Sequence, residues 1–354
     1  MTRVSAPHFL AWIALLGAAC APQPPRDFAP DANVLQQIRE IRIIPNAPRA
    51  CPGATIHADY EAILVDGSTV PFAESYNSKK PPQLHVQFLE RQSPDAVARD
   101  NGDWSAESNP LATESTGFRL TATLRANPGI TTTVVVPPTY ECMDHRFTYS
   151  GSLGGPGFRG GDGPDVTVQL EVHHSPFYER LYVAAIQAGN AKPDYVLADS
   201  SAMRLSEWLE VDSRGGDGGN GWPGSDGING TPGSAGCPGG RGGDGANGSD
   251  GGPGGDGGDG GRITIVVPPN RPELAKLVRT ASWGGNGGFG GAGGHGGAAG
   301  PGGAGLFDTN NQPCANGDNG SAGRDGSRGR SGFSGSAGPR TTVASAHRSI
   351  APTD

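Results

Sequence analysis

The sequence GGDGGNGWPGSDGINGTPGSAGCPGG, residues 215–240, has a glycine at every third position, and this period continues to Gly260. A chain of the polyproline II type has three residues per turn, so every third residue lies on the same face of it. Glycine at all of these positions indicates that something approaches that face closely. The period therefore predicts extended chain segments that pack against one another.

Two arrangements satisfy this spacing. In collagen three chains wind together and only glycine fits at the axis, whereas in polyglycine II one chain folds back into parallel and antiparallel helices that hydrogen-bond to their neighbours. Proline is sparse in this run, and the residue after the periodic glycine is often a second glycine. Two bare faces suit an inner helix of a folded-back bundle, so we expect that fold, with a collagen-like trimer or a disordered chain as alternatives. The doubled glycines are Gly216, Gly219, Gly240, Gly243, Gly252, Gly255, Gly258 and Gly261.

The third position of the triplets is mostly Asp, Asn or Pro, which predicts an outward, solvated row. The stretch GGDGGDGG also resembles the calcium-binding nonapeptide repeats of secreted toxins, so a calcium-binding repeat protein is an alternative. Those repeats need one large apolar residue in every nine, and it is absent here. Matches to the nucleotide-binding pattern G-x-G-x-x-G, such as Gly216, Gly218 and Gly221, arise from the period itself, and we expect no cofactor.

The glycine runs alternate with strand-like segments between residues 151 and 340. A short run at 151–163 precedes Val166-Thr167-Val168, and the long run precedes Ile263-Thr264-Ile265. A second correspondence, with an offset of about 69 residues, aligns Leu205 onward with Leu274 onward. Further triplets occupy 284–305 and 317–338, and 341–354 reads as a disordered tail. This region resembles polyglycine II proteins, such as insect antifreeze proteins and phage tail-tip adhesins, or collagen-like repeat proteins.

The N-terminus reads as an export signal over residues 1–19. Arg3 precedes an apolar run from Phe9 to Ala19 that is too short to remain as a membrane span. LLGAAC resembles the lipobox of bacterial lipoproteins, which implies lipidation at Cys20, and residues 20–39 read as the lipidated cysteine and its tether. An ordinary secreted protein is the alternative. We expect an exported chain anchored to a membrane, in the outer membrane or at the cell surface.

Four further cysteines remain, and an oxidising compartment lets disulfides persist. We favour pairing Cys51 with Cys142 and Cys237 with Cys314, because each bridge then ties one region to itself, although other pairings are open. Their spacing does not support a metal site.

Residues 40–150 contain short alternating runs separated by turn signals such as Asp66-Gly67, which predicts a β-sandwich loosely similar to immunoglobulin-like domains. Trp104 lies in a polar stretch that reads as a loop. The expected fold class is therefore mainly β, with a β-sandwich at 40–150 followed by a β and glycine-triplet region at 151–340.

No catalytic pattern stands out. His173, His174 and Ser175 beside Glu171 are adjacent in an expected strand and point to opposite faces, so they do not form one site. Trp208, Trp222 and Trp283 lie at or near the starts of glycine runs, where we expect them to cover the ends of the bundle as core residues, with ligand stacking as the alternative.

The net charge of -8 argues against nucleic acid as a partner. We expect a non-enzymatic surface lipoprotein with a structural, adhesive or interaction role. Its partners would be the membrane, through the N-terminal lipid, and a surface polymer or another protein, with a monomer favoured over a trimer. A secreted enzyme with its site in 40–150 is the alternative from a different class.

Overall fold

The computed structural model describes residues 24–25, 28–201, 208–346 and 349–351, and it is mainly β. The signal segment and Cys20 lie outside the described residues. Two compact units divide the chain between Thr139 and Tyr140. No helix among the described residues is both long enough and apolar enough to cross a membrane.

The strands described in the first unit, β1 to β10, lie in three small sheets, whose orders are β1-β3-β4-β5, β10-β9-β6 and β2-β8-β7. Strand β9 alternates buried and less buried residues along its whole length, as expected for a strand with one face on a core. The elements are α1 Ala32–Gln37, β1 Ile38–Pro45, β2 Thr55–Ile56, β3 Ala58–Leu64, β4 Thr69–Ala73, β5 Leu84–His85, the 3-10 helix η1 Val86–Phe88, β6 Leu89–Gln92, β7 Ala96–Ala98, β8 Trp104–Ala106, α2 Pro110–Thr113, β9 Phe118–Leu124 and β10 Thr131–Val136.

The turns of this unit follow from local chemistry. The Asp31 side chain accepts hydrogen bonds from the N–H groups of Asn33 and Val34 and so caps α1. Between β3 and β4, Gly67 has a φ of 85°, which glycine adopts without a steric penalty, and the Asp66 side chain accepts a bond from the Ser68 N–H. The expected turn at Asp66-Gly67 is therefore present.

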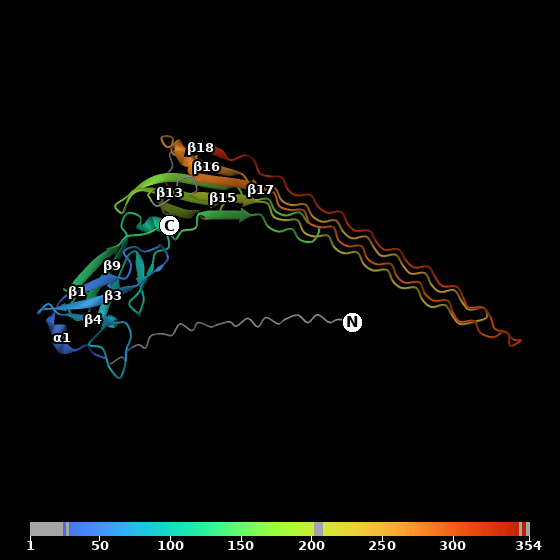
Figure 1. Cartoon of the computed structure of the whole chain (residues 1–354), viewed down its shortest axis with the longest axis horizontal. Coiled ribbons are helices and arrows are strands. Elements are labelled where there is room, and N and C mark those ends of the chain that lie inside the picture. The colour runs from blue at the N-terminus through green and yellow to red at the C-terminus, as the bar shows by residue number, and fades with distance from the viewer. Residues whose placement is uncertain (1–23, 26–27, 202–207, 347–348, 352–354) are drawn as a thin grey trace. The chain divides into compact units, whose positions relative to one another are not determined.

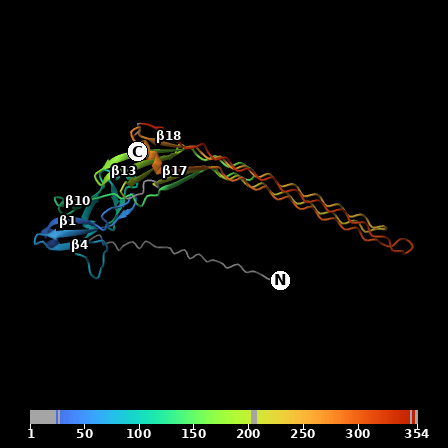
Figure 2. The same cartoon turned by 45° about the horizontal axis from the view of Figure 1, so that its top comes forward.

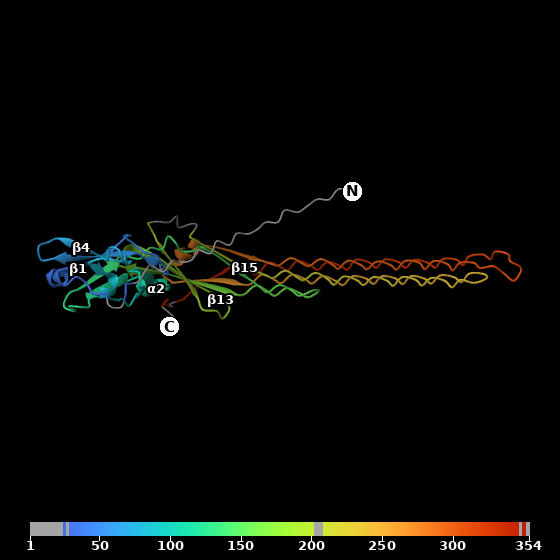
Figure 3. The same ribbon diagram turned by 90° about the horizontal axis from the view of Figure 1, so that it is seen from below.

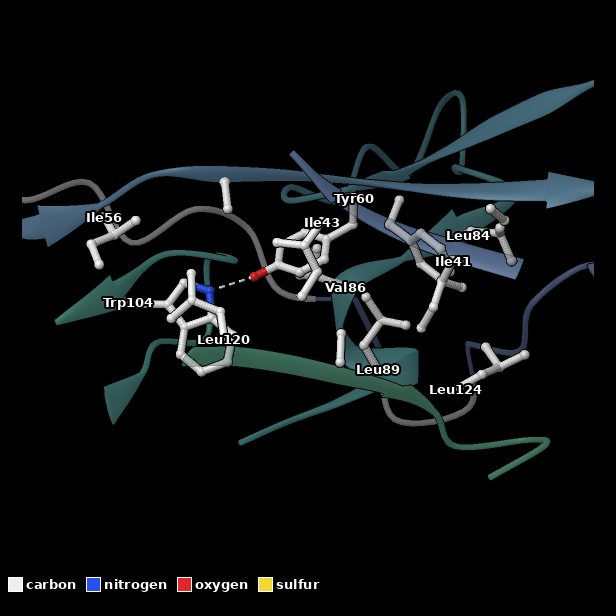
Figure 4. Close-up of a cluster of buried hydrophobic side chains, with 14 of the residues drawn as sticks. Ile41, Ile43, Ile56, Tyr60, Leu84, Val86, Leu89, Trp104, Leu120 and Leu124 are labelled. Atoms are coloured by element: carbon white, nitrogen blue, oxygen red, sulfur yellow. Dashed lines mark hydrogen bonds between the residues drawn. The ribbon is translucent and has the colours of Figure 1, made fainter. Parts of the chain in front are cut away.

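Trp104 is at the centre of the first unit's core, so the expectation of a loop at this residue is wrong. Its side chain is fully buried in β8, and its indole N–H donates to the Tyr60 hydroxyl at 2.8 Å (Figure 4). That hydroxyl donates in turn to the Gly102 carbonyl at 2.7 Å. A buried tryptophan needs such a partner for its N–H, and here the partner is 44 residues away in sequence.

The second unit contains two sheets, with the orders β11-β15-β17 and β14-β13-β12-β16-β18 (Figure 1). The first is entirely parallel. Side chains of both sheets, including Leu209, Val211, Ile263 and Ile265, share one hydrophobic core. The elements are β11 Arg146–Ser150, β12 Val166–Ser175, β13 Tyr178–Ala188, β14 Asp194–Asp199, β15 Leu209–Arg214, β16 Ile263–Val267, the 3-10 helix η3 Pro272–Leu277, β17 Val278–Trp283 and β18 Thr342–Ser345.

The two correspondences between parts of the sequence match residues that pair with each other in neighbouring strands. Val166 pairs with Ile263 and Val168 with Ile265, so the two motifs lie side by side in β12 and β16. Leu209 pairs with Val278 in β15 and β17, and the same separation of 69 residues continues beyond the strands to Asp217 and Asn286. Both correspondences in the sequence therefore coincide with parallel strand pairs.

Residues 341–354 are not simply a disordered tail. Thr342–Ser345 form β18, which pairs in parallel with β16, and Ile350 is buried with its N–H bonded to Glu171. Residues 146–150 likewise belong with the second unit, because β11 pairs with β15. In both places the pairing partner is distant in sequence, which local composition does not reveal.

Six glycine-rich segments continue directly from, or lead directly into, these strands. We name them T1 (151–157), T2 (158–163), T3 (215–236), T4 (239–261), T5 (284–305) and T6 (317–338). T1, T3 and T5 follow β11, β15 and β17, whereas T2, T4 and T6 lead to β12, β16 and β18. Figure 2 and Figure 3 show the long segments T3 to T6 side by side in different views.

Backbone hydrogen bonds connect each segment to its neighbours. From Gly218 to Gly236, the first glycine of every T3 triplet donates its N–H to a T5 carbonyl in a parallel arrangement, at 2.7–3.1 Å. T4 donates to T6 in the same way, and to T3 in an antiparallel arrangement, as between Gly252 and Trp222 at 2.7 Å. T1, T3 and T5 therefore form one row, and T2, T4 and T6 form a second row against it.

A disulfide joins Cys237, in the turn between T3 and T4, to Cys314 just before T6, with a Cα–Cα distance of 5.2 Å. This pairing was expected and is confirmed. Cys51 and Cys142 are each in the disulfide-bonded form.

Candidate interaction surface

Glycine is required wherever a Cβ atom would enter a neighbouring backbone. We call the periodic glycine of T1 to T5 position 1, and the next two residues positions 2 and 3. A Cβ at Gly221, in position 1 of T3, would lie 2.0 Å from the Gly252 carbonyl oxygen of T4. A Cβ at Gly291, in position 2 of T5, would lie 1.9 Å from the Trp222 carbonyl oxygen of T3. No side chain fits at such distances.

The length of T1 shows that this requirement depends on neighbours. Position 2 of T3 is glycine at Gly216 and Gly219, where a Cβ would lie within 2 Å of the T1 carbonyls of Ser152 and Gly155. Beyond the end of T1 position 2 carries side chains, and Trp222 and Ile228 are 65% and 80% exposed. The residues concerned are Trp222, Ser225, Ile228, Thr231 and Ser234.

T6 supports the same rule from the other edge. Each T6 triplet has one glycine, from Gly317 to Gly335, and T4 carbonyls leave no room for a Cβ there. A Cβ on Gly329, for example, would lie 2.0 Å from the Gly252 carbonyl oxygen. The other two residues of each T6 triplet carry side chains. T5 has neighbours on both sides and is glycine at positions 1 and 2 from 284 to 303, with Ala299 as the exception. In T5 the position-1 glycines face T6 carbonyls and the position-2 glycines face T3 carbonyls, as at Gly284 and Gly285.

Position 3 points outward, as expected, but its Asp and Asn side chains also bond to the backbone. In T3 the Oδ1 atoms of Asp217, Asn220, Asp226 and Asn229 accept from T5 N–H groups at 2.7–2.9 Å. In T4 Asp244, Asn247, Asp250, Asp256 and Asp259 accept from T6 in the same way. These oxygens satisfy donors that the segments leave without a backbone acceptor.

The outward residues of each row form two surfaces with different chemistry. The T3/T5 face has Asp217 and Asp226 as its carboxylates and carries several rings and alanines. The T4/T6 face carries arginines and aspartates together. The T3/T5 face comprises Asp217, Asn220, Pro223, Asp226, Asn229, Pro232 and Ala235 of T3, with Trp283, Asn286, Phe289, Ala292, His295, Ala298, Pro301, Ala304 and Phe307 along T5. The T4/T6 face comprises Arg241, Asp244, Asn247, Asp250, Pro253, Asp256 and Asp259 with Asp318, Ser321, Arg324, Ser327, Arg330, Phe333 and Ser336.

Only one of the three tryptophans assigned to the core lies there. Trp208 is 1% exposed, whereas Trp222 and Trp283 are 65% and 60% exposed. The prediction is wrong for these two, because Trp222 lies beyond the end of T1 and Trp283 occupies the outward row. Phe289 and Phe307, exposed in the same row, were missed, although their spacing from Trp283 in multiples of six residues was readable in the sequence.

The histidines of β12 lie in two different settings. His173 Nε2 is 3.2 Å from Glu171 Oε2, and the Ser175 hydroxyl accepts from the Phe177 N–H. His174 lines a surface pocket, also bordered by Arg180 and Arg271, which the sequence did not indicate. The pocket lining is Glu171, Val172, His174, Glu179, Arg180, Pro268, Asn270 and Arg271.

One acidic cluster in the first unit bears on the enzyme alternative. His57 Nδ1 lies 2.9 Å from Asp103 Oδ1, and burial, with the nearby charges of Asp103 and Asp59, raises the pKa of the Glu74 carboxyl. The His57 side chain is 62% exposed. The Asp103 carboxylate therefore orients the imidazole of His57, but most of the imidazole faces solvent. Within the described ranges no group of three or more His, Cys, Asp or Glu residues is arranged to hold a metal ion.

Comparison of the chain with protein-family models, with curated proteins and with solved structures found no match.

Proposed function

We propose that this chain is an exported, non-enzymatic surface lipoprotein whose glycine segments form a rigid, folded-back polyglycine II layer that presents flat faces to a partner. In this proposal the lipid on Cys20 anchors the chain to a membrane, the residues between Cys20 and α1 are a tether, and the first unit, which α1 and β1 already belong to, is an immunoglobulin-like scaffold. The role is structural or adhesive.

The neighbour-dependent placement of glycine carries the proposal. Because packing between segments uses backbone atoms and positions 1 and 2, the outward side chains have no part in a core. Phe289 at 67% exposure and Phe307 at 66% therefore remain available to a partner. Exposed apolar side chains on an ordered surface are typical of interaction sites. The Cys237–Cys314 bridge supports an oxidising, exported environment.

Adhesion by cells that display the chain tests this role. Replacing Phe289 and Phe307 by serine should reduce attachment of the cells to one another or to surfaces, since both side chains are exposed on the T3/T5 face. Phe333→Ser on the T4/T6 face is the matched control, because Phe333 is 68% exposed. Unchanged attachment in a variant that lacks the whole of T3 to T6 would contradict the proposal.

The anchor is tested separately. Mass spectrometry of the exported wild-type chain should find an acylated Cys20 at the N-terminus, and Cys20→Ser should release the protein from the membrane fraction. An unmodified N-terminal segment in the wild-type chain would contradict a lipoprotein.

A further inference from the structure

The outward row of T5 places a ring at every sixth residue. These residues are Trp283, Phe289, His295, Pro301 and Phe307. The two phenylalanines are 67% and 66% exposed, Trp283 is 60% exposed and the His295 side chain is 84% exposed. The residues midway between the rings are small: Asn286, Ala292, Ala298 and Ala304.

The backbone of this row is fixed. Phe289, His295 and Ala298 each donate their N–H to an Asp or Asn side chain of T3. T5 also bonds to T4 through position 2, as from Gly291 to the Gly252 carbonyl at 2.9 Å. Rings and gaps therefore stay at constant spacing, about 9 Å from each ring to the next gap at roughly 3.1 Å per residue.

A row in which large and small residues alternate evenly is complementary to its own antiparallel copy. A two-fold axis midway between Ala292 and His295 relates each position to its counterpart on the second chain. Phe289 then meets Ala298, His295 meets Ala292 and Trp283 meets Ala304. Every ring in this overlap faces a small residue, as close packing between identical surfaces requires.

The charges of the T3/T5 face permit this contact. The same axis places Asp226 of T3 opposite Pro223 and Asp217 opposite Pro232, so no two carboxylates oppose each other. Arg214 already pairs with Asp217 at 3.0 Å in its own chain. The T4/T6 face differs, because its rings, Pro253 and Phe333, do not recur at a fixed spacing and its aspartates and arginines do not alternate regularly with small residues.

The available area is sufficient. At about 3.1 Å per residue the overlap from Trp283 to Ala304 is roughly 65 Å long, and a strip about 10 Å wide buries roughly 650 Å² per copy, within the about 600–1,000 Å² per partner of specific interfaces.

We propose that the T3/T5 face binds a second copy of this chain, antiparallel, with the rings of each T5 row fitting into the alanine gaps of the other. This inference rests on the proposed function and names the partner of its T3/T5 face. A neutral polysaccharide stacked on the rings is the competing occupant.

Sedimentation equilibrium over a range of concentrations tests this proposal on the chain lacking residues 1–20. The wild type should dimerise. Phe289→Ala removes a ring and Ala298→Phe fills its gap, so each should raise the dimer dissociation constant at least about tenfold. The double variant F289A/A298F exchanges ring and gap, and it should restore dimerisation toward the wild-type value. Phe333→Ala, on the T4/T6 face, should leave the constant unchanged.

The variants alter exposed position-3 side chains, so circular dichroism and thermal unfolding should match the wild type. A wild type that stays monomeric at all concentrations would overturn the dimer, as would a double variant that does not recover. If the monomer instead binds cellulose or chitin and Phe289→Ala abolishes that binding, the ring row serves a polysaccharide and the proposed surface function stands. Cell attachment that is unaffected by removing T3 to T6 would overturn the function as well.

Discussion

In the unit that ends at Thr139, Trp104 and Leu120 are fully buried among other side chains, whereas along T5 positions 1 and 2 are glycine from 284 to 303 apart from Ala299. The first region is held together by apolar side chains that leave water. In the second, backbones approach so closely that a carbonyl oxygen fills the place of a side chain. Large residues stabilise one region, and the absence of side chains permits the other.

This difference predicts opposite responses to substitution. Removing side chains should damage the first unit and leave the outward rows intact, whereas adding one methyl group should damage the triplet segments. The following changes test the contrast, in order of decreasing effect.

The largest effect is expected from Trp104→Ala in the first unit. The change leaves a cavity and removes the indole donor of the Tyr60 hydroxyl, which keeps its bond to the Gly102 carbonyl, and should lower the free energy of unfolding by about 3–5 kcal/mol. Calorimetry should show the transition of this unit at lower temperature. Amide exchange in T3 to T6 should not change; faster exchange there would show that the two regions do not depend on separate packing.

Two residues of T3, three apart and both in position 2, give the closest comparison within the triplet segments. Gly219→Ala would put a Cβ 1.8 Å from the Gly155 carbonyl oxygen and should cost about 1–3 kcal/mol or more. Trp222→Ala, beyond the end of T1, should change stability by less than about 0.5 kcal/mol. If denaturant unfolding shows that the two variants lose the same free energy of unfolding, glycine at position 2 is not required by the neighbouring segment.

A smaller loss is expected from Asp250→Ala in T4. Its Oδ1 accepts from the Ser327 N–H at 2.6 Å, and a hydrogen bond of this kind contributes about 0.5–1.5 kcal/mol. Asp250→Asn keeps an acceptor oxygen and should remain near wild-type stability. If the asparagine variant is as unstable as the alanine variant, Asp250 stabilises the fold through its negative charge and not through this hydrogen bond.

The smallest effect is expected from acid acting on the first unit. Burial alone would raise the pKa of Asp95, but the hydrogen bonds and charge of Arg119 outweigh it and hold the pKa below its ordinary value. The folded state therefore favours the carboxylate, and this stability is present above about pH 4 and lost as pH falls through the lowered pKa. The free energy of unfolding of Asp95→Asn should depend less on pH below about 4 than that of the wild type. If the two depend on pH equally, other carboxyl groups cause the loss of stability in acid.

Local pattern predicted much of the second unit. The strand-like segments at 166–172 and 263–268 correspond to β12 and β16, and the offset of 69 residues is the pairing of β15 with β17. The Cys237–Cys314 bridge followed from regional grouping. Each of these features involves two segments of similar sequence or similar composition. Comparing the chain with itself was therefore enough to predict them.

Features set by distant partners were not predicted. The burial of Trp104 depends on Tyr60, and the side chains at Trp222 and Ile228 depend on where T1 ends. The hydrogen bond from the Phe289 N–H to the Asn220 side chain spans 69 residues. The sequence predicted that the Asp and Asn row is solvated, but it did not indicate that these side chains also join two segments. The ring row of T5 was visible in the sequence, but its exposure required the register of the neighbouring segments.

Amide hydrogen exchange resolved to single residues tests the packing of the triplet segments most directly. The Gly248 and Gly251 N–H groups donate to T6 at 2.9 Å, whereas among the described residues the Ile228 and Thr231 N–H groups, beyond the end of T1, have no acceptor. We expect strong protection of the first pair and fast exchange of the second within one folded chain. Equal exchange at all four amides would contradict the account, because it would mean either a disordered glycine region or packing that does not follow these neighbours.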